Sequence, residues 1–259
     1  TIKVAQGIYF PSTPDTNEIC DVITIVPASR SVFFFIPNSS VVLGGYPAGG
    51  ETNGPRDPHC NITILSGDIN HDGDSTGNSY NVVKTRNYAD TIVFDGFIIE
   101  HGNALAANED GGGWWDGSLA DSAKLIIRNT IFRFNYAVSG AGYYGEGNRD
   151  LMMGNSEFYD NLALIHGGGA YVGPVAADGD TSFIRFENVL WHHNEVTDPM
   201  GAGGGLAGIV GALSNEVIDI VNNTFTLNVP DGYANNSDGL VNIYNTILWN
   251  TGTPPVGGS

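Results

Sequence analysis

The chain has 259 residues, of which 41% are hydrophobic, and its 10 Lys+Arg stand against 28 Asp+Glu for a formal net charge of −18. This charge argues against nucleic acid and anionic membrane surfaces as partners, and no apolar run reaches transmembrane length. The negative net charge is compatible with calcium binding and with an exported, extracellular setting.

Short segments rich in β-branched and aromatic residues, separated by Pro, Gly and Asn, predict strands along the whole chain. In chain order the predicted strands cover residues 2–5, 22–26, 32–36, 41–43, 61–65, 80–83, 91–100, 124–128, 182–186, 217–221 and 240–244. No signal peptide precedes the first of them, so we expect a mature or trimmed piece of a longer precursor.

Cys20 and Cys60 are the two cysteines of the chain. A disulfide between them would tie a loop to an early part of the fold and contribute about 3–4 kcal/mol in the loop-entropy model. An exported chain would allow this bond. Two free thiols are the alternative, because an even cysteine count by itself does not establish a pair.

A loop insertion is predicted at residues 66–79. Asp68, Asn70, Asp72 and Asp74 alternate there with other residues, and Gly73 supplies a tight turn. Oxygen ligands at this spacing suit a hard cation, which predicts a Ca²⁺ site. The acidic residue that ends an EF-hand loop is replaced by Ser79, and the flanking segments are strands. The alternative is a surface loop in which Asp and Asn form local Asx turns.

Two adjacent tryptophans, Trp114 and Trp115, follow the acidic pair Glu109-Asp110 and precede Asp116. Neighbouring residues of a strand face opposite ways, so at most one of the two rings is expected to be exposed and free to stack on a sugar. The alternative is that one ring closes the core and the other covers a loop.

An Asn-bounded pattern returns along the second half of the chain and places a large apolar residue three positions before its last Asn. The copies are Asn129–Asn135, Asn155–Asn161, Asn188–Asn194 and the shorter Asn223–Asn228 and Asn245–Asn250, with Phe132, Phe158, Trp191, Phe225 and Ile247 as the apolar residues. Their first asparagines are 26, 33, 35 and 22 residues apart. A weaker copy covers residues 96–102. Such recurrence marks a repeat fold.

Glycine-rich marks separate the copies, at residues 112–113, 140–142, 168–169 and 204–205. Units of this length with two or three short strands each predict an all-β chain folded as a parallel β-helix, in which equivalent residues of successive coils lie about 4.8 Å apart. Parallel crossovers are right-handed as a rule, so we expect a right-handed coil. The aromatic residues should stack inward, and the repeated Asn should form a ladder of side-chain amides.

The residue after each inward aromatic should point outward, which predicts a surface column of Glu100, Arg133, Tyr159 and His192. The next position contributes Asp160 and His193. A polar band on a β-helix face is a candidate catalytic site, although a cross-strand hydrogen-bonding set explains it equally well. We expect His192 and His193 not to chelate one metal ion, because adjacent strand residues diverge.

Residues 1–251 are predicted to form one β-helix domain with irregular N-terminal coils. Residues 252–259 have the composition of a linker and are expected to continue into a longer chain or an assembly. Four Asn-x-Ser/Thr sequons would permit N-glycans on an exported chain. They begin at Asn38, Asn61, Asn222 and Asn235.

The alternation of Phe-x-x-Asn with Gly-Gly-Ala followed by a hydrophobic residue resembles the repeat of the polymorphic outer-membrane proteins. It also resembles other right-handed β-helix surface proteins related in fold to pectate lyases. The N-terminal segments Val42–Glu51, Arg56–Asp57, Ile64–Asp68 and Phe94–Phe97 are similar to the same set. The resemblance implies a right-handed β-helix over roughly residues 1–251. It does not select an activity, because such proteins include adhesins, structural proteins and polysaccharide enzymes.

We therefore expect a non-catalytic extracellular or cell-surface protein that acts in adhesion or as a structural subunit of a filament or surface layer. Its partners would be other protein subunits or surface ligands, and it would be able to form a homo-oligomer or fibre. The alternative is a lyase or glycoside hydrolase acting on an acidic polysaccharide, whose site would combine Glu100, Arg133, Tyr159, Asp160 and His192. A cleft lined by these residues would favour the enzyme.

Overall fold

The computed structural model describes residues 1–11, 29–117, 123–147, 149–173, 182–208, 217–235, 240–249 and 256–257. In these residues the regular structure is β-strand, apart from two short 3-10 helices, η1 (Glu51–Asn53) and η2 (Ala104–Ala107). The all-β prediction is confirmed. Cys20 and the strand predicted over residues 22–26 lie outside the described residues.

Every strand pair among the described residues is parallel. The strands form a large sheet of 14, a sheet of eight and a sheet of three. The large sheet contains β1 (Ile2–Ala5), β2 (Gly7–Tyr9), β4 (Val41–Tyr46), β5 (Thr63–Ser66), β7 (Thr91–Asp95), β8 (Ile98–Glu100), β10 (Ala123–Arg128), β11 (Ile131–Arg133), β14 (Arg149–Tyr159), β17 (Phe183–His192), β20 (Val217–Val221), β21 (Thr224–Thr226), β23 (Leu240–Tyr244) and β24 (Ile247–Trp249).

The two smaller sheets contain the remaining strands. The sheet of eight contains β3 (Phe34–Phe35), β6 (Val83–Arg86), β9 (Trp114–Gly117), β13 (Tyr143–Glu146), β16 (Ala170–Val172), β19 (Leu206–Gly208), β22 (Tyr233–Asn235) and β25 (Val256–Gly257). The sheet of three contains β12 (Tyr136–Ser139), β15 (Leu162–His166) and β18 (Glu195–Val196). β25 lies within the segment predicted as a linker and pairs with β22.

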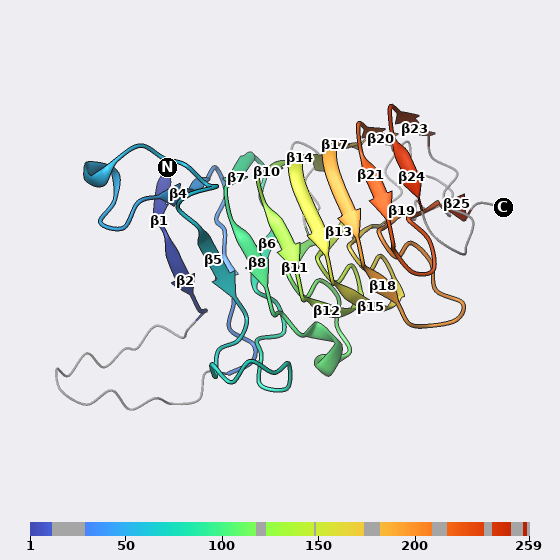
Figure 1. Cartoon of the computed structure of the whole chain (residues 1–259), viewed down its shortest axis with the longest axis horizontal. Helices are drawn as coiled ribbons and strands as arrows, with labels where there is room; N and C mark the ends of the chain where they lie inside the picture. The colour runs from blue at the N-terminus through green and yellow to red at the C-terminus, as the bar shows by residue number, and fades with distance from the viewer. Residues whose placement is uncertain are drawn as a thin grey trace.

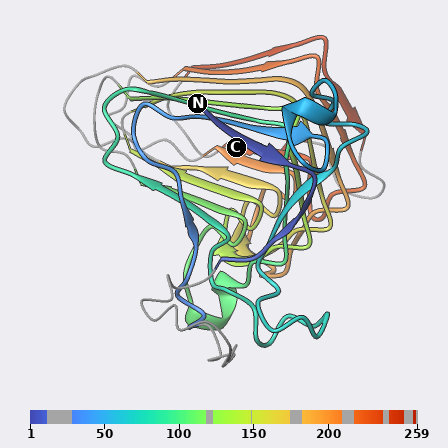
Figure 2. The ribbon, with the colours of Figure 1, turned by 90° about the vertical axis from the view of Figure 1, so that its left-hand side faces the viewer.

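Successive strands of each sheet follow one another along the long axis of the molecule, from β1 and β2 near the N-terminus to β23 and β24 near the C-terminus (Figure 1). A view along that axis shows the chain returning repeatedly to the same sides around a common interior (Figure 2). We call one such passage a coil; residues 123–147, from β10 to β13, are an example. The arrangement is consistent with the predicted β-solenoid.

The predicted inward stack of aromatic residues is confirmed. Phe132, Phe158, Trp191 and Phe225 pair in register on successive strands, and all four side chains are fully buried. Ring centroids are 4.5 Å apart for Phe132–Phe158, 4.3 Å for Phe158–Trp191 and 5.4 Å for Trp191–Phe225, with nearly parallel planes. This stack is part of one continuous apolar core.

The end of the stack corrects the sequence alignment. Phe225 pairs with Leu248, whereas Ile247 faces solvent with 58% of its surface exposed. The first Asn of the fourth copy is Asn222 rather than Asn223, since Asn222 has the left-handed backbone (φ 55°) of the other first asparagines. Asn is the non-Gly residue best suited to that conformation. The first asparagines therefore make the bend inside the large sheet, at Asn129, Asn155, Asn188, Asn222 and Asn245.

The second asparagines form the predicted amide ladder. Asn135, Asn161, Asn194 and Asn228 are buried. The side-chain N–H of each of the first three donates to the side-chain oxygen of the next at 2.9–3.0 Å. Each amide also donates to a main-chain carbonyl of the preceding coil, as Asn161 does to Phe132 at 2.9 Å. The ladder therefore joins each coil to the next at the same point of the repeat.

Glycine at the predicted marks permits close stacking of coils. A Cβ on Gly142 would lie 2.5 Å from the carbonyl oxygen of Gly169, and a Cβ on Gly169 would lie 2.4 Å from that of Gly205. These separations are shorter than any allowed contact, so only Gly lets one coil approach the next here.

The tryptophan pair lies on β9. Trp114 is fully buried and Trp115 is half-buried, as alternation predicts. Asp116 follows and is also fully buried. Its carboxylate accepts hydrogen bonds from Thr85 (2.9 Å), Tyr88 (3.1 Å) and Tyr143 (3.0 Å). Asp116 therefore satisfies buried hydroxyl groups of the core and is not part of a surface site.

Candidate functional site

The predicted surface column is present on the outer side of the large sheet. Glu100 on β8 is in register with Arg133 on β11, which is in register with Tyr159 on β14 and His192 on β17. Each follows an inward residue of its strand, so strand alternation turns its side chain outward. Successive members lie about 4.8 Å apart, the spacing of adjacent strands.

Arg133 joins the first three members of the column. Its guanidinium is 2.6 Å from the Glu100 carboxylate, and it donates a second hydrogen bond to the Tyr159 hydroxyl at 2.9 Å. Burial alone would lower the pKa of Arg133, but the hydrogen bonds to Tyr159 and Glu100 outweigh it, so the pKa is raised above its ordinary value. Arg133 is thus a permanent cation between a carboxylate and a phenol.

His192 ends the polar part of the column. Its ring stacks on Tyr159, with centroids 5.1 Å apart and planes 9° from parallel. Its Nε2 lies 2.9 Å from the Glu157 carboxylate, and its Nδ1 lies 2.8 Å from Nδ1 of His193. Glu157 is not among the predicted site residues, although its position one residue before the inward Phe158 indicates that it faces outward.

The expectation that His192 and His193 diverge is wrong. His193 has a left-handed backbone with φ 55°, and strand alternation does not apply to such a residue. The same conformation occurs in its counterparts on other coils, which are His101, Phe134, Asp160 and Leu227. Asp160 is exposed and lines a hollow of about 190 Å³ together with Phe134, His193 and Glu195.

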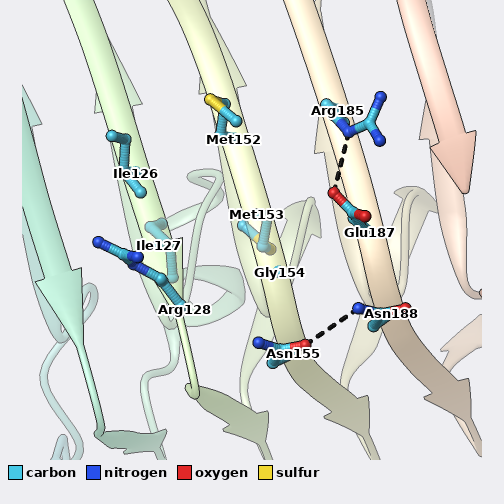
Figure 3. A pocket seen from close by; sticks show the side chains of 10 residues that line it. All are labelled: Ile126, Ile127, Arg128, Met152, Met153, Gly154, Asn155, Arg185, Glu187 and Asn188. Carbon is cyan, nitrogen blue, oxygen red and sulfur yellow. Dashed lines mark hydrogen bonds and ion pairs between the residues drawn. The ribbon is translucent and has the colours of Figure 1, made fainter.

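A second hollow lies on the same sheet, before the bend (Figure 3). It has a volume of about 250 Å³ and lies over Gly154, between Arg128 and Glu187 in the same register. Ile126 and Met152 contribute to its lining. Arg185 binds Glu187 at 3.1 Å and Arg128 approaches Asp95 at 3.8 Å, so both guanidinium groups are engaged by neighbouring carboxylates. No sequence motif marked this hollow.

The predicted calcium loop joins β5 to β6. Both oxygens of Asp68 accept main-chain N–H groups, from Asp72 at 3.3 Å and Gly73 at 3.2 Å. Asn70 donates its amide N–H to Asp72 at 2.6 Å. The Asp74 carboxylate accepts hydrogen bonds from the hydroxyl and the main-chain N–H of Thr76. These bonds lower the pKa of Asp74, and the bond from the hydroxyl has the larger effect. These contacts match the Asx-turn alternative.

Within the described residues no group of three or more His, Cys, Asp or Glu side chains is placed to hold a metal ion. The side-chain oxygens of Asp68, Asp72 and Asp74 accept hydrogen bonds from within the loop, and a calcium ion would have to replace these contacts. Calcium binding by Asp68, Asn70, Asp72 and Asp74 stays a prediction.

Thermal melts test the calcium prediction. If the loop binds calcium, millimolar calcium should raise Tm relative to chelator, because a ligand that binds only the folded state stabilises it. The Asp72→Ala variant should abolish the difference. Superimposable melts of the unmodified protein with calcium and with chelator would instead support the Asx-turn interpretation.

The remaining sequence-predicted residues are not brought into this column. Cys60 is exposed, and a hydrogen bond with Asp57 raises the pKa of its thiol. The predicted pairing cannot be placed because Cys20 is outside the described residues. Among the sequon asparagines, Asn38 and Asn222 are exposed and Asn61 and Asn235 are half-buried. Glycosylation of these sites stays a prediction.

Comparison with known proteins yields no match to a protein-family model, to a curated protein or to a solved structure. The resemblance to β-helix surface proteins therefore rests on the sequence motifs and segments named above. In the part of the chain that the structure describes, no helix is long and apolar enough to cross a membrane.

Proposed function

We propose that this chain is a non-catalytic, extracellular or cell-surface protein that acts in adhesion or assembly as a rigid right-handed β-helix. The right hand is inferred from the general rule for parallel crossovers. The repeated aromatic stack and the Asn ladder support a rigid element, because both connect each coil to the next over the same stretch of chain. The negative charge of the chain fits an exported setting.

One observation carries the non-catalytic part of the proposal. The polar groups of the candidate column are bonded to one another and to neighbouring side chains. Arg133 binds both Glu100 and Tyr159, and His192 contacts both Glu157 and His193. A general acid or base must reach the substrate with a free proton or lone pair. Polar groups that are hydrogen-bonded to neighbouring side chains in this way are better suited to stabilising the sheet than to catalysis.

Exposed apolar side chains support contact with other protein. Those of the two end coils include Ile2, Ile8, Phe33 and Phe35 on one side and Leu240, Ile243, Tyr244, Ile247 and Trp249 on the other. An apolar hollow of about 230 Å³ lies beside the first group. In the described residues β23 and β24 pair on one edge only, and such edges readily add a further strand. We infer that another copy of this chain is the partner.

The alternative function, cleavage of an acidic polysaccharide, is favoured by one arrangement. The Tyr159 hydroxyl accepts a hydrogen bond from the cationic Arg133 and its ring stacks on His192. The cationic Arg133 and the Tyr159 phenol thereby lie side by side on the outer face of the large sheet. Arg133 would in addition attract the carboxylate of a uronic acid.

A paired experiment separates the two functions. The purified protein is examined by light scattering over a range of concentrations, and it is incubated with a panel of acidic polysaccharides while unsaturated products and reducing ends are followed. We expect association that increases with concentration, and no turnover. Trp249→Asp should weaken association because it places a charge on the apolar end coil.

Met200→Asp is the matched control for association, since Met200 is 92% exposed outside the end coils. It should associate like the unmodified protein. Turnover that disappears in both Arg133→Ala and His192→Ala, but persists in Arg185→Ala, would replace the proposal by the enzymatic alternative. A monomer at every concentration would remove the assembly part of the proposal.

A further inference from the structure

The contact between His192 and His193 has a geometry that the rest of the column lacks. Their Nδ1 atoms are 2.8 Å apart and the ring planes are 84° from parallel. His192 is half-buried and His193 is exposed, so solvent reaches the pair. Because the left-handed backbone of His193 turns its ring toward His192, two consecutive residues present two imidazole nitrogens at one place.

The surroundings of His192 set its orientation. Nε2 lies 2.9 Å from Glu157, whose carboxylate accepts a hydrogen bond from that nitrogen, and the ring is stacked on Tyr159. A neutral imidazole with its proton on Nε2 has a lone pair on Nδ1. A carboxylate behind a histidine in this way is the usual support of a metal-binding imidazole, since it fixes the tautomer and raises ligand basicity.

The separation of the two nitrogens indicates which metal fits. Metal–imidazole bonds are about 2.0–2.1 Å long, so nitrogens 2.8 Å apart subtend an angle of about 84–89° at a shared ion. This is near the right angle of square-planar and tetragonal sites and well below the tetrahedral angle of structural zinc. Imidazole ligands in tetragonal geometry favour Cu²⁺ or Ni²⁺, and Cu²⁺ binds most tightly of the divalent series.

We propose that His192 and His193 form a Cu²⁺-binding site through their two Nδ1 atoms, with Glu157 as the residue that positions His192. No third His, Cys, Asp or Glu side chain is placed to join them among the described residues, so water would fill the other coordination positions. The adjacent hollow of about 190 Å³, lined by His193, Asp160 and Glu195, provides space for those waters. With the proton of His192 on Nε2, the 2.8 Å contact is a hydrogen bond that Nδ1–H of His193 donates to Nδ1 of His192. Metal binding would require His193 to change tautomer and carry its proton on Nε2, after which small rotations of the two rings would direct both lone pairs at one ion.

Titration of the purified, tag-free chain with CuCl₂ tests this site by calorimetry and electron paramagnetic resonance. We expect one ion per chain at this site and hyperfine structure from two equivalent nitrogens. His192→Gln and His193→Asn should each raise Kd by about 100-fold or more, because the two ligands act as one chelate. Asn is chosen at position 193 because it tolerates the left-handed backbone.

His101→Asn is the matched control, because His101 occupies the same left-handed position on an earlier coil (φ 62°). It should bind Cu²⁺ like the unmodified chain, and excess calcium should not displace the ion. Glu157→Gln should raise Kd by about 10-fold while both nitrogens remain in the spectrum. Affinity and spectrum unchanged in both His192→Gln and His193→Asn would overturn the proposal, as would a spectrum with a single nitrogen in the unmodified chain. Unaltered near-ultraviolet circular dichroism would show that the variants are folded.

Discussion

Replacing Phe158 by Ala is expected to lower the free energy of unfolding by about 3–5 kcal/mol. The Phe158 side chain is fully buried and lies between Phe132 and Trp191, with centroids 4.5 and 4.3 Å away. Both neighbours are held by strands that pair with β14. The stack therefore cannot collapse to fill the space left by the missing ring, and the cavity adds to the lost burial.

Equilibrium denaturation of the two proteins measures this effect. Leu190→Ala is the matched control, because Leu190 lies on the neighbouring strand β17 next to Trp191, faces outward and is 37% exposed. We expect it to lose much less stability, about 1 kcal/mol, since only part of its side chain leaves water on folding. A loss below 1 kcal/mol for Phe158→Ala would contradict the packed aromatic stack.

Asn161→Ala is expected to cost about 3 kcal/mol or more, although it removes little apolar surface. The amide of Asn161 donates to Asn194 and to the carbonyl of Phe132, and its oxygen accepts from the side chain and main chain of Asn135. Alanine would leave several buried polar groups without this partner. Each such group costs about 1–3 kcal/mol.

Asn155→Gly on the same coil provides the comparison. Asn155 is exposed and has φ 49°, and Gly adopts that conformation without strain. The variant loses an exposed hydrogen bond with Asn188 and should change stability by about 1 kcal/mol or less. The same denaturation measurement applies. Equal losses of stability for Asn161→Ala and Asn155→Gly would show that the buried amide ladder contributes no more than the exposed hydrogen bond of Asn155.

The candidate column could be predicted because it depends on one local rule. Once Phe132, Phe158 and Trp191 are assigned to the interior, strand alternation places Arg133, Tyr159 and His192 outside. Stacking of coils then brings these residues together with Glu100. The contacts within the column were not predictable. Whether Arg133 would bind Glu100, Tyr159 or a ligand depends on side-chain positions that no spacing encodes.

Local chemistry by itself determined the strands, the inward aromatic residues and the bends. Inward positions need large apolar groups, the bend inside the large sheet favours Asn, and close-stacked coils need Gly at positions such as Gly142 and Gly169. Each of these requirements leaves a residue type at a regular position, so all are visible in the sequence.

Only the tertiary structure decided which residues pair between coils, and which individual polar residues are buried or in contact. Pairing with Phe225 falls on Leu248 rather than Ile247, because register is set by backbone hydrogen bonds between coils and not by counting back from Asn250. Asp116 is buried because Tyr88, Thr85 and Tyr143 from other segments supply its hydrogen bonds. The approach of His193 to His192 likewise depends on a backbone angle (φ 55°) that the stacked coils impose and that two consecutive histidines do not encode.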